Sequence, residues 1–141
     1  MGAASIPSRS LVRRIDGYEP VCQLAVGGMA EVYLARTEPN LDRLVVIKTL
    51  MGSQQEDSDR LTMFVDEMRI ARLLQHANIV DLIEAAALDM QPYLVLEYID
   101  GPSLRDLAAS SRLRDKAMDV RLATSLAVYV CDGLHYAHEL K

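Results

Sequence analysis

The sequence lacks several features that mark specialised classes of protein. It has no tryptophan, one phenylalanine and six tyrosines, which weakens any case for an aromatic platform that stacks on bases or sugars. Its two cysteines, Cys22 and Cys131, are too few for a disulfide framework or a zinc site and are typical of a reducing cytosol. No apolar run reaches the roughly 18 residues of a membrane span. The N-terminus carries neither a secretory signal nor a myristoylation signal. We therefore expect a cytoplasmic protein.

The charge balance is acidic. The 141 residues include 20 Asp and Glu against 15 Lys and Arg, which gives a net charge of −5 and an isoelectric point near 5.1. A nucleic-acid-binding domain shows the opposite balance, so we expect no nucleic-acid partner. Half of the residues are hydrophobic and 25% are charged, as in ordinary folded domains. The length suits one small domain or part of a larger one.

Apolar periodicity and turn residues predict an α+β chain. The first 14 residues, with Pro7 and several serines and arginines, predict a flexible arm. Strands are expected over 18–24, 31–36, 43–50, 79–88 and 92–98, and helices over 59–75, 103–110 and 118–140. The first two strands are predicted to form a hairpin around the small residues at 25–30.

Gly27 and Gly28 lie at the predicted turn of this hairpin. Glycine lets backbone N–H groups approach a ligand closely, and such concavities of amides favour anions. An ordinary hairpin turn is the alternative explanation of the two glycines. Taken alone, the turn therefore does not decide between the two.

Lys48 and Glu67 are charged residues on predicted apolar faces. Strand alternation places Lys48 between Val46 and Leu50, where it either reaches solvent at the sheet rim or is buried with a partner. Helical spacing places Glu67 in one stripe with Phe64, where either the helix turns it to solvent or a cation meets it. One strand packed against the next helix would bring the two charges together. Since buried ion pairs contribute little stability, we expect this pair to position the ammonium for an anionic group.

Five motifs, in this order, resemble the N-terminal lobe of protein kinases. They are residues 27–33 (Gly-Gly-Met-Ala-Glu-Val-Tyr), residues 45–48 (Val-Val-Ile-Lys), the helix with the inward Glu67, residues 76–80 (His-Ala-Asn-Ile-Val) and residues 94–101 (Leu-Val-Leu-Glu-Tyr-Ile-Asp-Gly). The string over residues 27–36 is most similar to bacterial serine/threonine kinases. The resemblance covers residues 15–141, and its strength lies in the order and spacing of the motifs.

The resemblance implies a site for ATP. Gly27 and Gly28 would cover the phosphates, with Ala25 at the first position of the glycine pattern. Lys48 would hold the α- and β-phosphates and Glu67 would orient Lys48, which makes these two the catalytic residues of the chain. The remaining residues would surround the base and the ribose: Val32 and Val46 against the adenine, Leu96 at the gatekeeper position, the backbones of Glu97 and Ile99 at the adenine edge, and Ser103 near the ribose.

The chain departs from the kinase pattern at three positions and at its end. Ala25 and Ala30 stand at the first and third glycine positions, and Val46 stands where alanine is usual, which adds bulk beside the adenine. In the family, the catalytic aspartate, the ligands of Mg²⁺ and the activation segment would all follow Lys141. We therefore expect the ligands of Mg²⁺ in a part absent from this chain, and no metal site within it.

The favoured interpretation is a fragment of an ATP-dependent serine/threonine protein kinase, with ATP and a protein substrate as partners. The alternatives are a non-catalytic kinase-like module that binds a nucleotide or a partner, and an unrelated α+β binding domain. The expected fold is a kinase-like N-lobe over 15–98, with a five-stranded antiparallel sheet and one long helix. A hinge at 99–102 and the first helices of an incomplete helical lobe over 103–141 would follow.

Overall fold

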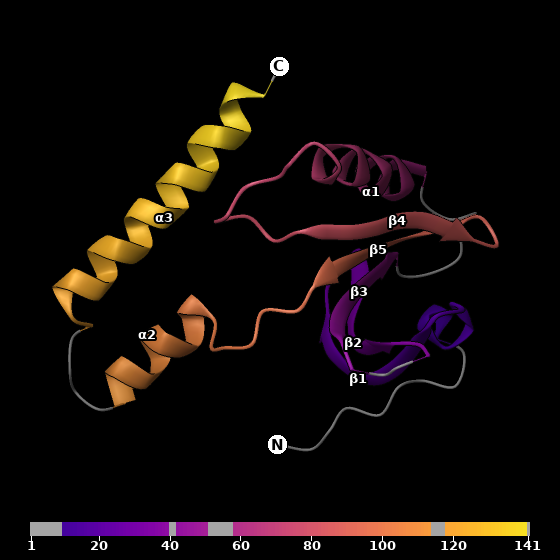
Figure 1. The fold of residues 1–141 in the computed structure, drawn as a ribbon, viewed down its shortest axis with the longest axis horizontal. Coiled ribbons are helices and arrows are strands. Elements are labelled where there is room, and N and C mark those ends of the chain that lie inside the picture. The colour runs from indigo at the N-terminus through magenta and orange to yellow at the C-terminus, as the bar shows by residue number, and fades with distance from the viewer. Residues whose placement is uncertain (1–9, 40–41, 51–57, 114–117, 141) are drawn as a thin grey trace. The chain divides into compact units, whose positions relative to one another are not determined.

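The computed structural model describes residues 10–39, 42–50, 58–113 and 118–140 (Figure 1). The chain divides into two compact units. The first unit holds the residues up to Gln75 together with Asp81–Tyr98, and the second holds His76–Val80 together with the residues from Ile99 onward. The segment 99–102 begins where the first unit ends, and its role as a hinge stays a prediction.

The first unit is built on a five-stranded antiparallel sheet with the strand order β1-β2-β3-β5-β4. Its strands are β1 (Tyr18–Val26), β2 (Ala30–Thr37), β3 (Leu44–Leu50), β4 (Leu82–Leu88) and β5 (Gln91–Glu97). The predicted sheet is confirmed, with one boundary corrected. The β-branched Ile79 and Val80 predict a strand from residue 79, but these residues belong to the second unit, so tertiary packing overrides their strand propensity.

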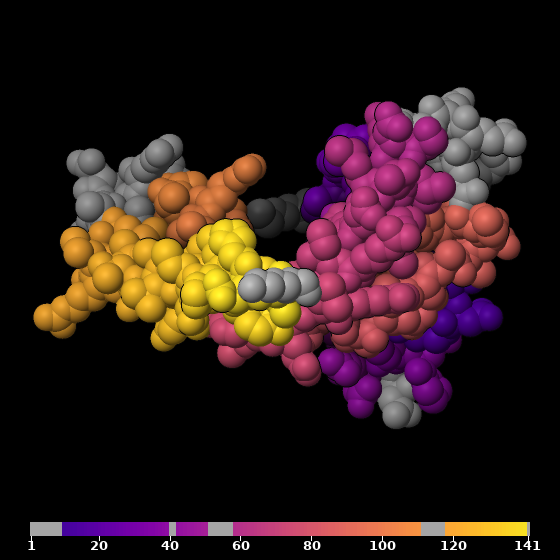
Figure 2. Space-filling view, turned by 90° about the horizontal axis from the view of Figure 1, so that it is seen from above, coloured from indigo at the N-terminus to yellow at the C-terminus, as the bar shows by residue number. Residues whose placement is uncertain are grey.

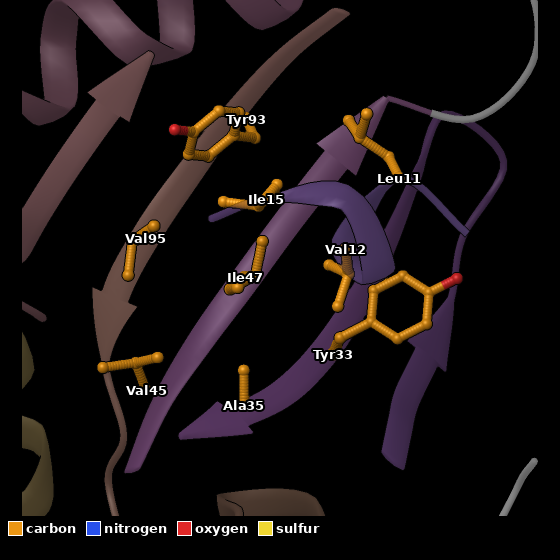
Figure 3. Close-up of a cluster of buried hydrophobic side chains, with 9 residues drawn as sticks. All are labelled: Leu11, Val12, Ile15, Tyr33, Ala35, Val45, Ile47, Tyr93 and Val95. Atoms are coloured by element: carbon orange, nitrogen blue, oxygen red, sulfur yellow. The ribbon is translucent and has the colours of Figure 1, made fainter. Parts of the chain in front are cut away.

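One face of the sheet is covered by η1 (Leu11–Arg14), a short 3-10 helix. Leu11, Val12 and Ile15 are buried against the sheet. Figure 3 shows them packed on the inward side chains of β2, β3 and β5, which are Tyr33, Ala35, Val45, Ile47, Tyr93 and Val95. The flexible arm predicted over 1–14 is therefore wrong for residues 10–14, while residues 1–9 lie outside the described part. The surrounding arginines and serines make this segment look polar in the sequence. Its few apolar residues are nevertheless stabilised by packing on the sheet.

Replacing Val12 by alanine is expected to lower the free energy of unfolding by about 1–3 kcal/mol, because it removes two buried methyl groups and leaves a cavity. Val12 is 0% exposed, whereas Val21 of β1 is 42% exposed and serves as the matched control. Urea unfolding of both variants measures the difference. Equal midpoints for Val12→Ala and Val21→Ala would contradict the packing of η1 on the sheet.

A shared carboxylate ties the two edge strands of the sheet together. Glu84 of β4 accepts hydrogen bonds from the hydroxyls of Tyr18 of β1 (2.8 Å) and Tyr93 of β5 (2.7 Å). The pKa of Tyr18 is raised to about 12, mainly because the hydroxyl is buried and secondly because it is bonded to Glu84. The same causes raise the pKa of Tyr93. Both tyrosines therefore keep their protons and act as donors at neutral pH.

The opposite face of the sheet carries α1 (Ser58–Ala71). Phe64 of this helix is buried with Leu50 of β3 and Leu94 of β5. The outward side of α1 lies at the molecular surface (Figure 2). Met63 and Ile70 of this helix are exposed. The helix ends at Ala71 and not at Gln75 as predicted, because the following N–H groups of Leu73 and Leu74 bond three residues back in a tightened last turn.

The second unit contains α2 (Leu104–Leu113) and α3 (Val120–Glu139). The carboxylate of Asp119 caps α3 by accepting hydrogen bonds from the N–H groups of Arg121 and Leu122. Part of the predicted apolar stripe of α3 is exposed to solvent, including Leu122, Val130 and Leu134. None of the helices in the described part of the chain is both long and apolar enough to cross a membrane.

The segment His76–Val80 packs on α3 within this unit. The ring of His76 stacks on Tyr136 with 5.0 Å between centroids, and its Nδ1 accepts a hydrogen bond from the N–H of Asn78. The side chain of Asn78 donates to Asp132 at 2.9 Å. A Cβ added at Gly133 would lie 3.3 Å from the carbonyl oxygen of Asn78, so glycine allows the close approach. The interpretation of His76 as a structural residue that closes a turn is confirmed.

Candidate functional site

The strongest feature of the first unit is an ion pair between Lys48 and Glu67. Lys48 Nζ donates to Glu67 Oε1 at 2.5 Å and to Oε2 at 2.8 Å, so one ammonium contacts both carboxylate oxygens. The pair joins the middle of β3 to α1 and confirms that the strand and the next helix bring the two charges together. The side chains are 26% and 47% exposed, so the pair is only partly buried.

Local packing explains how the pair forms. Alternation on β3 turns Lys48 to the face that α1 covers, on the same side as the buried Leu50. Glu67 lies one helical turn after the buried Phe64, so the contact that anchors the helix also aims the carboxylate at β3. The ammonium lies 5.9 Å from the centre of the Phe64 ring.

Partial exposure matters for the chemistry of this pair. Ion pairs that are exposed to this degree contribute about 0–1 kcal/mol to stability. An ammonium has three donors, however, and within the described residues Glu67 is the only hydrogen-bond partner found for Lys48. The arrangement holds a cation in a fixed position with an open side toward solvent, which suits it to bind an anion.

The glycine hairpin stands at the β1–β2 end of the same sheet. The N–H of Gly27 donates to the carbonyl of Ala30 at 2.9 Å and closes the turn. A Cβ at Gly28 would have no atom within 4 Å, and neither Gly27 nor Gly28 has a positive φ. The fold of the hairpin therefore does not itself require glycine at 28. A ligand that approaches the backbone closely would require it. Ala25 is exposed beside them.

Half-buried apolar side chains lie next to Lys48 on the same face of the sheet. Val32 is the register partner of Lys48, and Val46 is the partner of Leu96. Residues paired directly across an antiparallel sheet share a face. All three apolar side chains are of intermediate burial. The first unit therefore presents an apolar surface beside a fixed cation.

Glu97 is held at the end of β5 by two bonds to Asp81. Its N–H donates to the carbonyl of Asp81 at 3.0 Å, and its carboxylate accepts from the N–H of Asp81 at 2.8 Å. The carboxylate bond was not predictable from motifs, because it joins the residue before β4 to the end of β5. With its N–H engaged, Glu97 offers only its carbonyl oxygen for a contact with a base.

Ile99 and Ser103 belong to the second unit. Ile99 is exposed. The Ser103 hydroxyl donates to Asp106 Oδ2 at 2.6 Å and accepts from the N–H of Asp106, which is a capping arrangement at the start of α2. The hydroxyl bond, together with a second bond from the backbone N–H of Ser103 to the same carboxylate oxygen, holds the pKa of the Asp106 carboxyl below its usual value. The capping role of Ser103 is confirmed, while its place near a ribose stays a prediction, as does the contact of Ile99 with a base.

The described residues can also be compared with the ligand set that a metal ion needs. Within the described ranges, no three His, Cys, Asp or Glu side chains come together in a way that could hold a metal ion. The acidic side chain nearest to the site, Glu67, is engaged by Lys48. The described residues therefore do not offer a ligand set for Mg²⁺.

Comparison with known proteins identifies the family. The profile of the protein kinase domain matches residues 18–141. The chain belongs to the protein kinase domain family. Its relatives include the tyrosine-protein kinase MasK of Myxococcus xanthus, which is 34% identical over 142 residues covering 95% of this chain and 22% of that protein. The serine/threonine-protein kinase PknB of Mycobacterium leprae is 32% identical over 88% of this chain and 20% of its own length.

Solved structures agree with the family. The kinase domain of PknI from Mycobacterium tuberculosis superposes with a TM-score of 0.69 at 25% sequence identity, over 88% of this chain and 49% of that chain. The kinase-like fold expected from the motifs is thereby confirmed. The chain spans about a fifth of the length of the curated relatives and about half of the solved kinase domain. Several relatives are named serine/threonine kinases and one is named a tyrosine kinase.

Proposed function

We propose that the chain forms the ATP-binding half of a protein kinase, and that the protein which carries it transfers the γ-phosphate of ATP to serine or threonine hydroxyls of protein substrates. The observation that carries the proposal is the contact of Lys48 with both carboxylate oxygens of Glu67. In protein kinases, a lysine of this strand held by a glutamate of this helix contacts the phosphates. A cytoplasmic location, where ATP is abundant, belongs to the same proposal.

The phosphates would lie between the glycine hairpin and Lys48. The open side of the ammonium supports this placement, as does the free space above Gly28. Backbone N–H groups and a single fixed cation together favour a polyanion. Ala25 adds one methyl group at the rim of this site, where it is exposed to solvent.

The adenine would lie on the half-buried apolar surface of Val32, Val46 and Leu96. A flat base buries its ring faces against such side chains, and burial of apolar area contributes about 25 cal/mol per Å². The edge of the base would donate a hydrogen bond to the carbonyl of Glu97 and would also bond the backbone of Ile99. Ser103 would lie near the ribose.

Mg²⁺ would arrive with the nucleotide and neutralise charge that develops on the transferred phosphoryl group. This chain's own residues would bind the nucleotide, hold its α- and β-phosphates at Lys48 and keep that lysine in place through Glu67. Nothing in the comparisons favours the non-catalytic alternative.

Calorimetric titration of the purified full-length protein with ATP in the presence of Mg²⁺ tests the nucleotide site. We expect ATP to bind saturably and adenosine to compete with it, because adenosine fills the same apolar surface although it has no phosphates. Absence of heat and of competition would contradict the proposed site.

A second assay tests the acceptor. Transfer of labelled phosphate from ATP to a mixed protein acceptor, followed by phosphoamino-acid analysis, is expected to yield phosphoserine and phosphothreonine. Phosphotyrosine alone would place the protein with the relative named a tyrosine kinase and overturn the serine/threonine assignment, while leaving the nucleotide site intact.

A further inference from the structure

Three polar side chains form a connected group on the β1–β2 hairpin, on the face opposite the proposed nucleotide surface. They are Gln23 of β1 and Glu31 and Tyr33 of β2. Alternation on β2 turns Glu31 and Tyr33 to one face and Val32 to the other. The group therefore lies behind the strand segments that lead into and out of the glycine turn.

The hydroxyl of Tyr33 is the centre of the group. It accepts a hydrogen bond from Gln23 Nε2 at 3.2 Å and donates one to Glu31 Oε2 at 3.0 Å. Gln23 Nε2 also reaches Glu31 Oε1 at 3.5 Å. The three side chains thus close a ring of contacts across the two strands.

Tyr33 is anchored more firmly than its two partners. It is 0% exposed and packs in the core with Val12 and Ile47, whereas Gln23 and Glu31 are only partly buried. Figure 3 shows its hydroxyl directed away from the centre of the cluster. Burial is the main cause that raises the pKa of Tyr33, so the hydroxyl remains a donor. The core therefore fixes the position of the hydroxyl, and the hydroxyl fixes the other two side chains.

These hydrogen bonds matter for the hairpin because the register of its two strands is irregular. The pairing of β1 with β2 shifts between Gln23 and Ala25, so one residue of β1 has no partner there. A bulge of this kind weakens the ladder locally and bends the strand. Gln23 lies on the stem side of the shift, and Glu31 pairs with Val26 on the turn side. The hydrogen bonds of Tyr33 therefore span the irregular step.

We propose that Tyr33 is a positioning residue for the nucleotide: its hydroxyl, bonded to Gln23 and Glu31 across the bulge, holds the glycine turn in the conformation that receives the phosphates. This inference rests on the proposed ATP site. The residue does not contact the nucleotide, because it faces the opposite side of the sheet. Its effect passes through the backbone of residues 24–31.

Tyr33→Phe is the variant that tests the proposal, since it keeps the ring in the core and removes only the hydroxyl. We expect a rise of about 3- to 10-fold in KM for ATP, which corresponds to the loss of one or two hydrogen bonds. The value of kcat is expected to stay within about 2-fold, because Lys48 and Glu67 are unchanged. Tyr93→Phe is the matched control. It removes a hydroxyl that also donates to a carboxylate, from a tyrosine that is likewise buried (7% exposed) but lies on β5, away from the hairpin.

Amide hydrogen exchange without nucleotide separates this inference from the proposed function. In Tyr33→Phe, the amides of residues 24–31 are expected to exchange about 3- to 10-fold faster than in the unaltered protein, while Tyr93→Phe leaves them unchanged. Unchanged exchange in Tyr33→Phe overturns the positioning role even where ATP binds normally. Faster exchange with an unchanged KM also overturns it. Failure of the unaltered protein to bind ATP overturns the proposed function instead.

Discussion

Replacing Lys48 by methionine is expected to abolish phosphoryl transfer in the full-length protein while leaving the fold intact. Methionine has a side chain of similar length but carries no charge, so the cation beside the proposed phosphate site is lost. Loss of one preorganised electrostatic contact typically lowers kcat by about 100- to 1,000-fold. The remaining partner, Glu67, is 47% exposed, so its carboxylate stays solvated.

The stability of this variant separates a chemical role from a structural one. A pair that is exposed to this degree is worth about 0–1 kcal/mol, so the unfolding midpoint of Lys48→Met is expected to match that of the unaltered protein closely. Activity is measured as transfer of labelled phosphate, and stability by urea unfolding. Retention of activity would show that the phosphate role assigned to Lys48 is wrong. Loss of activity together with unfolding would show that Lys48 is a structural residue.

The pairing of Lys48 with Glu67 could be predicted because it depends on short-range patterns. Period-two alternation on a strand and helical spacing on the next helix each place one charge on an apolar face. Two opposite charges on faces that must pack together then meet. The degree of exposure could not be predicted in this way, because it depends on how far α1 extends over β3.

The burial of η1 could not be predicted from local composition. Leu11, Val12 and Ile15 are few, and arginines and serines surround them. Their burial depends on the apolar face of a sheet whose strands come from residues 30–97, which is a long-range effect. A search for apolar residues at spacings of one and four next to the first strand would have found them.

The start of β4 was predicted wrongly, and the bulge in β1 was not predicted, for a related reason. Ile79 and Val80 have high strand propensity, but the segment packs on α3 close to Gly133. Alternation predicts which face Gln23 and Tyr33 share, yet it assumes a regular register. The shift between Gln23 and Ala25 breaks that assumption, and the polar group that spans it appears only in the three-dimensional structure.

Replacing Glu67 by glutamine is expected to lower kcat/KM by about 10- to 100-fold, less than Lys48→Met, because the ammonium remains but is no longer held by a charge. Asp66→Asn is the matched control. Asp66 precedes Glu67 on α1, is 55% exposed and pairs with Arg69 at 3.0 Å, so it loses the same charge without touching Lys48. Steady-state kinetics of both variants measures the difference.

The double variant decides whether the two residues act as a unit. If Glu67 works only by orienting Lys48, adding Glu67→Gln to Lys48→Met costs nothing further, because effects of residues that act together are not additive. An additive loss would give the carboxylate a second role that does not pass through Lys48. Equal losses of kcat/KM for Glu67→Gln and Asp66→Asn would mean that removal of any negative charge from α1 has the same effect. The contact of Glu67 with Lys48 at 2.5 Å and 2.8 Å would then have no special function.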